Sequence, residues 1–217
     1  MHRKQILFFD LDGTLTDSAP GILNSVTYAL EKMGIPVEDR RALYRFIGPP
    51  LLDSFRDYYG MDSKNAEQAV AFYREYFSAG GLFENSVYEG IPSLLADLRA
   101  AGKTLAVATS KPEAFTLRIL ERFDLAKYFD FVGAATLDES RNQKHQVVAH
   151  TLALCGHPPL DSVVMVGDRH HDVEGARVNG LETVGVLYGF GDRAELEQAG
   201  AAAIAETVAD LRKILLG

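Results

Sequence analysis

A pair of carboxylates follows a short apolar run near the start of the chain. Asp10 and Asp12 come directly after Ile6–Phe9, within the turn Asp10-Leu11-Asp12-Gly13. Residues two apart in extended backbone point to the same side, so both carboxylates can enter one pocket. Alone, an Asp-x-Asp is more often a turn than a site. It becomes informative when other polar groups are expected at the same place.

Three further polar segments have the same setting, at the end of an apolar run or beside a helix start. Thr109-Ser110 precedes Pro112, where a hydroxyl and free backbone N–H groups at a helix start form an anion site. Asp168 follows the apolar run 162–166, with Asp172 four residues later, and Lys144 lies near the start of the preceding helical segment. Each segment alone could be a helix cap or a solvated charge. Together they supply four carboxylates, a hydroxyl and an ammonium, and a bound divalent cation would compensate the repulsion among the carboxylates.

The elements that would position these residues alternate between strand and helix. Short buried strands are predicted at 5–9, 104–108, 131–134, 162–166 and 183–187, with helical stretches between and after the later ones. This alternation predicts an α/β protein with a parallel sheet covered on both faces. Ligands in such sheets bind at the carboxyl ends of the strands, which is where the polar segments lie.

Between the first two of these strands the pattern is helical throughout. We predict helices at 20–33, 37–46, 51–59 and 63–77, separated by glycine and proline breaks. The predicted domains are therefore a core of residues 1–15 plus 83–217 and an inserted all-helical cap of residues 16–82. Inserted after the first strand, the cap should lie over the same sheet edge as a lid.

Composition limits the classes of partner. The 217 residues carry a formal charge of −8, with 47% hydrophobic and 24% charged residues, as in ordinary soluble proteins. An acidic chain has no electrostatic footprint for nucleic acid or anionic lipid, so we expect neither partner. The single cysteine excludes an intramolecular disulfide, and no apolar run approaches a membrane span. We expect a cytoplasmic protein and leave its oligomeric state, monomer or dimer, open.

The segment Phe8-Phe9-Asp10-Leu11-Asp12-Gly13-Thr14-Leu15-Thr16-Asp17-Ser18 resembles the first motif of the haloacid dehalogenase-like phosphohydrolases. Thr109-Ser110 resembles the family's second motif, Lys144 its third, and Gly167-Asp168 through Asp172 its fourth, all in the family's order. The helical insert is similar to the cap of the phosphoglycolate phosphatase-like branch, which includes 5′-nucleotidases and phosphomutases. The resemblance implies a three-layer Rossmann-like core.

The resemblance also implies a role for each motif residue. Asp10 would be the nucleophile, forming an aspartyl-phosphate, and Asp12 the general acid and base. Mg²⁺ would be held by Asp10, the backbone carbonyl of Asp12 and Asp168, and oriented by Asp172. The phosphoryl oxygens would be bound by Thr109, the Ser110 backbone and Lys144, with Lys111 as the less favoured alternative lysine.

Substrate choice is expected to depend on the cap. The loop containing Arg45 and Gly48 joins two cap helices, and Arg45 could bind a second anionic group of the substrate or lie solvated beside a rigid turn. We therefore expect a Mg²⁺-dependent phosphatase acting on a small phosphorylated metabolite. A β-phosphoglucomutase-like phosphomutase is the alternative, and an idle binding protein on this scaffold is less favoured. The adjacent His170 and His171 are expected to diverge and not to share a metal ion.

Overall fold

The computed structural model describes residues 1–138 and 140–217, which form two compact units. The first consists of Met1–Thr16 and Val87–Gly217, and the second of Asp17–Ser86. The short strands β2 (Thr16–Asp17) and β3 (Ser86–Val87) pair where the chain passes between units.

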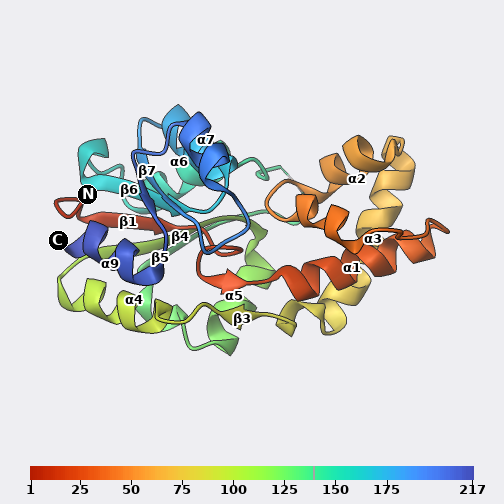
Figure 1. Ribbon diagram of the computed structural model, residues 1–217, viewed down its shortest axis with the longest axis horizontal. Helices are drawn as coiled ribbons and strands as arrows, with labels where there is room; N and C mark the ends of the chain where they lie inside the picture. Colours follow the sequence, from red (N-terminus) through yellow and green to blue (C-terminus); the bar gives the residue numbers. More distant parts are fainter. Residues whose placement is uncertain (139) are drawn as a thin grey trace. The chain divides into compact units, whose positions relative to one another are not determined.

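A six-stranded parallel sheet forms the centre of the first unit, in the order β5-β4-β1-β6-β7-β8 (Figure 1). The strands are β1 (Ile6–Phe9), β4 (Thr104–Pro112), β5 (Phe131–Ala135), β6 (Val163–Gly167), β7 (Glu182–Val186) and β8 (Ala203–Ala205). The helices are α4 (Ile91–Ala100), α5 (Glu113–Arg122), α6 (Lys144–Leu154), α7 (His170–Val178), α8 (Arg193–Ala199) and α9 (Val208–Leu216), with single 3₁₀ turns at Ala126–Tyr128 and Leu160–Ser162.

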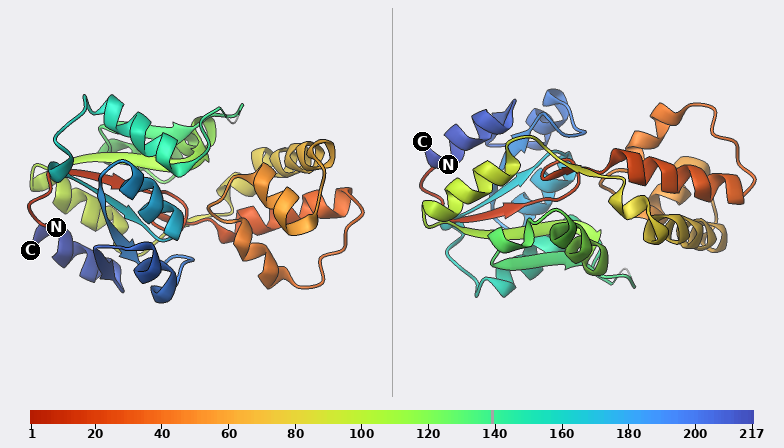
Figure 2. Two further views of the ribbon diagram at one scale, coloured as in Figure 1. Left: turned by 90° about the horizontal axis from the view of Figure 1, so that it is seen from above. Right: turned by 90° about the horizontal axis from the view of Figure 1, so that it is seen from below.

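Helices cover both faces of this sheet, so its central strands are apolar on both sides. Helices α6 and α7 lie on one face, and α4 and α9 on the other (Figures 1 and 2). Phe8 and Met165 on the first face pack with Val147 and Val148 of α6 in one fully buried cluster. These observations confirm the α/β class and the parallel sheet. Among the described residues, no helix is both long and apolar enough to cross a membrane.

The second unit is built from helices: α1 (Ala19–Lys32), α2 (Leu51–Tyr59) and α3 (Ser63–Ala79), with 3₁₀ helices η1 (Arg40–Phe46) and η2 (Gly81–Phe83). The helix predicted at 37–46 is only the shorter η1, which begins after Asp39, whose carboxylate accepts a hydrogen bond from Arg41 N. Phe46 fixes the following segment, because its ring packs 5.0 Å from Phe55 and 5.4 Å from Tyr58, both on α2.

Candidate active site

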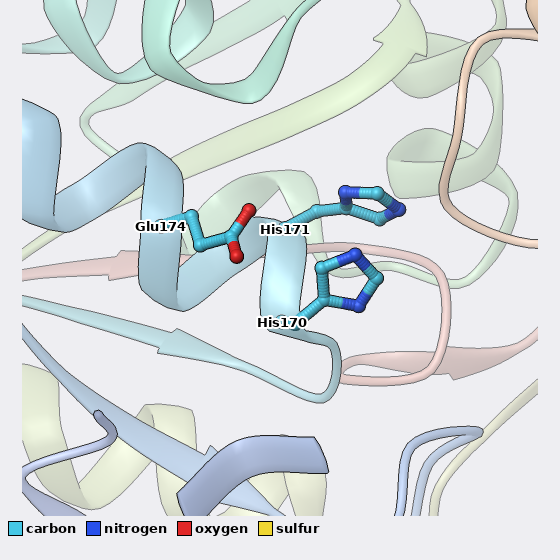
Figure 3. Close-up of side chains that lie close together, drawn as sticks. All are labelled: His170, His171 and Glu174. Atoms are coloured by element: carbon cyan, nitrogen blue, oxygen red, sulfur yellow. The ribbon is translucent and has the colours of Figure 1, made fainter. Parts of the chain in front are cut away.

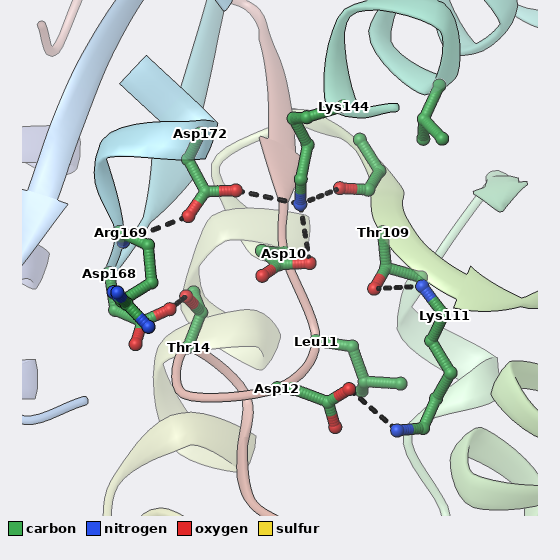
Figure 4. Close-up of polar contacts among 12 residues, drawn as sticks. Asp10, Leu11, Asp12, Thr14, Thr109, Lys111, Lys144, Asp168, Arg169 and Asp172 are labelled. Atoms are coloured by element: carbon green, nitrogen blue, oxygen red, sulfur yellow. Dashed lines mark hydrogen bonds and ion pairs between the residues drawn. The ribbon is translucent and has the colours of Figure 1, made fainter. Parts of the chain in front are cut away.

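The carboxyl ends of three central strands meet at one edge of the sheet. Phe9 is in register with Val107 of β4 and with Val166 of β6. The residues that follow therefore emerge side by side: Asp10 after β1, Thr109 near the end of β4 and Asp168 after β6 (Figure 4). The structure thus places the first, second and fourth motif segments at the same edge.

Lys144 enters this edge from the first turn of α6. Its Nζ lies 2.8 Å from Asp10 Oδ1 and 2.7 Å from Asp172 Oδ1, and it donates to Ala108 O at 3.2 Å (Figure 4). Burial alone would lower the pKa of this lysine, but the two carboxylates outweigh it and raise its pKa. Lys144 is therefore a fixed positive charge beside Asp10.

The three buried carboxylates of Asp10, Asp168 and Asp172 form an acidic cluster. One oxygen of each lies within 4.8 Å of the others. Burial and, to a smaller extent, the Asp172 carboxylate outweigh the opposing effect of Lys144 and together raise the pKa of Asp10 to about 6. Burial also raises the pKa of Asp168 well above its ordinary value, and the negative charges of Asp172 and Asp10 add smaller effects in the same direction. One ammonium does not balance three carboxylates, so an oxygen-only cluster of this charge fits a hard divalent cation.

Asp12 is paired with a different lysine. Lys111 Nζ lies 2.6 Å from Asp12 Oδ2, and Lys111 N donates to Thr109 Oγ1 at 3.2 Å (Figure 4). Asp12 Oδ1 is buried, and no described residue forms a hydrogen bond with it. The two candidate lysines therefore contact different aspartates, Lys144 at Asp10 and Lys111 at Asp12. Sequence reasoning did not predict the second pairing.

The loop after β7 is a further part of the site that sequence reasoning missed. Phe190 N donates to Asp168 Oδ2 at 2.8 Å, and the Tyr188 hydroxyl donates to Thr14 O at 3.2 Å. At Gly189 a Cβ would lie 2.5 Å from the Asp168 Cβ, so a side chain there would displace Asp168. The loop therefore fixes the Asp168 carboxylate and the turn after β1. Its only sequence signal is the spacing of glycines after a strand.

The remaining predicted residues differ in their surroundings. Ser110 is half-buried next to the buried Thr109. In the second unit Gly48 is exposed with φ +109°, a left-handed backbone that favours glycine. Arg45 is also exposed, and its guanidinium carbon lies 4.3 Å from the centre of the Tyr58 ring and 5.7 Å from that of Tyr59. Arg45 thus has aromatic partners within its own unit.

Comparison with known proteins shows the family. The model for haloacid dehalogenase-like hydrolases matches residues 7–186. A 5′-nucleotidase of Pseudomonas aeruginosa is 43% identical over 209 residues, covering 96% of this chain and 94% of the relative. The tyrosine-protein kinase PtkA of Mycobacterium tuberculosis is also 43% identical, over 97% of this chain and 72% of the kinase. The crystal structure of a predicted phosphatase from Clostridium acetobutylicum matches with a TM-score of 0.95 at 47% identity, covering 98% of both chains.

These matches confirm the family and the enzyme class that the motifs indicated. The chain belongs to the haloacid dehalogenase-like hydrolases and acts as a phosphatase, a hydrolase of phosphoric monoesters.

Proposed function

We propose that this phosphatase hydrolyses a small phosphorylated metabolite through a covalent aspartyl-phosphate on Asp10. The observation that carries the proposal is the separation of two aspartates with different partners at one sheet edge. Asp10 lies beside Lys144 and the acidic cluster, whereas Asp12, two residues later, has one oxygen without a hydrogen-bond partner among the described residues. Such a pair fits one nucleophile and one proton carrier.

In the first step a carboxylate oxygen of Asp10 forms a bond to phosphorus, and the ester P–O bond breaks. The leaving oxygen takes its proton from the carboxyl group of Asp12. In the second step the Asp12 carboxylate removes a proton from water, whose oxygen attacks phosphorus. The bond to Asp10 then breaks, and inorganic phosphate and the original Asp10 carboxylate result.

Hydrogen-bond donors and a cation would stabilise the charge that develops on the phosphoryl oxygens. We assign the donors to Thr109 Oγ1, the backbone N–H of Ser110 and Lys144. Lys144 is suited to this because Asp10, Asp172 and the Ala108 carbonyl already fix its Nζ.

We propose that the cation is Mg²⁺, held by Asp10, the backbone carbonyl of Asp12 and Asp168. When bound it supplies positive charge to the phosphoryl oxygens. Asp172 would orient the cluster, since it holds both Lys144 and the backbone N–H of Arg169, the latter at 3.1 Å. Phe190 N holds Asp168 in the same way.

Nucleoside 5′-monophosphates are the first substrates to test, because the P. aeruginosa relative named 5′-nucleotidase matches nearly the full length of both chains. Phosphoglycolate remains the alternative within the same branch. Identity alone does not decide, since a relative named as a tyrosine kinase is equally similar. We further propose that the helical unit serves as the cap, with Arg45 and Gly48 in its specificity loop. A phosphomutase would need an anchor for a second phosphate. The specificity loop offers one arginine for this, Arg45, whose guanidinium carbon already lies 4.3 Å from the centre of the Tyr58 ring, so we rank the phosphomutase below the phosphatase.

Phosphate release from a panel of metabolite phosphates, measured with Mg²⁺, with Ca²⁺ and in EDTA, tests the proposal. Asp10→Asn should lose at least about a thousandfold in kcat, because an amide cannot form the phosphoenzyme. Asp124→Asn, an exposed change in the same unit, is the matched control. Mg²⁺ should support activity better than Ca²⁺, whose looser coordination spoils alignment. Full activity in EDTA or in Asp10→Asn would contradict the mechanism, and phosphoryl transfer from ATP to tyrosine without phosphatase activity would contradict the function.

A further inference from the structure

The first two turns of α7 bring together three side chains of types that can ligate metals, and none of the three belongs to the acidic cluster. One ligand atom each of His170, His171 and Glu174 lies within 4.8 Å of the others (Figure 3). His170 and Glu174 are four residues apart and therefore lie on the same face of the helix. The two histidine rings were expected to diverge, but their centres lie only 3.8 Å apart, so that expectation is wrong for this pair.

A carboxylate behind His170 fixes its ring. Glu195, on α8, places Oε1 2.7 Å from His170 Nδ1, and the same oxygen accepts from His170 N and from Arg169 Nε, both at 2.8 Å. This contact assigns the proton to Nδ1 and leaves the lone pair of Nε2 for a ligand. Metal-binding histidines almost always donate their other ring nitrogen to a carboxylate, carbonyl or water.

We propose that His170, His171 and Glu174 form a second metal site, which takes a borderline divalent ion such as Zn²⁺. Two imidazole nitrogens and one carboxylate are a common donor set for zinc, with a fourth position left to water. Mg²⁺ prefers oxygen ligands, so the two sites would select different ions. The proposal does not depend on the reaction proposed above.

Geometry and charge both permit this site. Ligand atoms sharing a zinc ion lie about 3.4 Å apart, from bond lengths of about 2.05 Å, so the three groups must move closer. The exposed Glu174 and the half-buried His171 must supply most of this movement, because Glu195 holds the His170 ring. The positive end of the helix dipole opposes a cation here, and Glu195 is already paired with the Arg169 guanidinium, so the exposed Glu174 carboxylate supplies the compensating negative charge.

Cobalt titration of the full chain tests the site, because Co²⁺ reports nitrogen ligation by visible absorption and Zn²⁺ displaces it. Saturating Mg²⁺ is kept present to occupy the acidic cluster. One equivalent of Co²⁺ should bind, and His170→Gln, His171→Gln or Glu174→Gln should each weaken binding by tenfold or more. Glu195→Gln should weaken it about ten- to a hundredfold, as expected of the residue behind a ligand. His2→Gln, at an exposed histidine outside the site, should change nothing.

Circular dichroism and thermal unfolding of each variant separate loss of the site from loss of the fold. Because Glu174 is exposed, Glu174→Gln remains informative even where a histidine variant unfolds. Unchanged Co²⁺ binding in a folded Glu174→Gln and a folded His170→Gln would overturn the proposal. So would Co²⁺ binding that is lost in Asp168→Asn but not in these variants, because it would place the ion in the acidic cluster.

Discussion

Replacing Lys144 by methionine should destabilise the protein strongly, and the loss should depend on divalent cation. The ammonium of Lys144 contacts two buried carboxylates, Asp10 at 2.8 Å and Asp172 at 2.7 Å. Methionine fills similar space without a charge, so the variant leaves both carboxylates buried beside Asp168 with no compensating cation.

Removing one partner of a buried ion pair lowers the free energy of unfolding by about 3–5 kcal/mol, and we expect a loss of this size for Lys144→Met. For a chain of this length, 1 kcal/mol changes the melting temperature by about 2–4 °C. We therefore expect Lys144→Met to lower the melting temperature in EDTA by roughly 6–20 °C. Mg²⁺ should restore part of this loss, because it supplies positive charge to the same carboxylates.

Lys103 offers a matched control in the same unit. Lys103 and Lys144 are 7% and 8% exposed, but the Lys103 ammonium donates to the backbone carbonyls of His2 and Lys4, at 2.8 and 2.6 Å. Lys103→Met should therefore be destabilised equally in EDTA and in Mg²⁺. Thermal and urea unfolding of both variants in both buffers measures this. A Lys144→Met loss below about 1 kcal/mol, or one that Mg²⁺ does not change, would refute the electrostatic reasoning.

Three further predictions concern the pH dependence, the loop after β7 and the proposed cap. In EDTA the folded protein binds a proton at Asp10 more tightly than the unfolded chain does, because burial raises this pKa from 3.8 to about 6; stability should therefore fall as pH rises from about 4 through about 6. The contribution of Asp10 to the free energy of unfolding is on the order of 3 kcal/mol. Urea unfolding at several pH values should show this fall in stability without Mg²⁺ and a smaller fall with it. A rise in stability over this pH range would contradict the assignment. Tyr188→Phe removes the hydrogen bond to Thr14 O and should raise severalfold the Mg²⁺ concentration that half-maximally stabilises the fold. Tyr28→Phe, which removes a hydroxyl contact with Glu75, should leave this concentration unchanged. Equal Mg²⁺ affinities of the two variants would exclude a positioning role for Tyr188. Arg45→Ala should lose about ten- to a hundredfold in kcat/KM on the best anionic metabolite and little on p-nitrophenyl phosphate. Equal losses on both would indicate that Arg45 acts through its stacking on Tyr58.

The elements that could be predicted from sequence are those whose hydrophobic pattern extends over several consecutive residues. Buried parallel strands are continuous apolar runs, and crossover helices are amphipathic, so the alternation after residue 90 defines the sheet. Asp10 and Asp168 could be placed because each directly follows such a run, and the strand end determines where its next residue emerges.

Short or irregular elements gave no such signal. Strand β8 has only three residues, Ala203–Ala205, and pairs on one side with β7, so an alanine-rich segment was not distinguishable from a loop. Strand β4 continues past the predicted 104–108 to Pro112, with a register shift between Thr109 and Pro112 that no residue pattern encodes.

The contacts missed at the site are long-range and partly made by backbone. Lys111 and Asp12 are 99 residues apart, and the Phe190–Asp168 bond uses a main-chain N–H that every residue except proline has. Neither contact could be predicted from residue type. The steric signal exists only in three dimensions, where the Gly189 position has no room for a Cβ beside Asp168.

Each aspartate of the site has a different set of partners, and these partners fit separate roles in cation binding and in proton transfer. Asp10 has the ammonium of Lys144, and Asp12 has that of Lys111. Asp168 is held by the Phe190 N–H and, at 3.4 Å, by the Thr14 hydroxyl, while its nearest charged neighbours in the cluster are other carboxylates. The uncompensated negative charge is therefore greatest between Asp168 and Asp10, where a divalent cation would be held most strongly. Asp12 is paired with Lys111 instead. A cation bound at the cluster would therefore leave Asp12 Oδ1, which has no hydrogen-bond partner in the described part of the chain, available to exchange protons with the leaving group and with water.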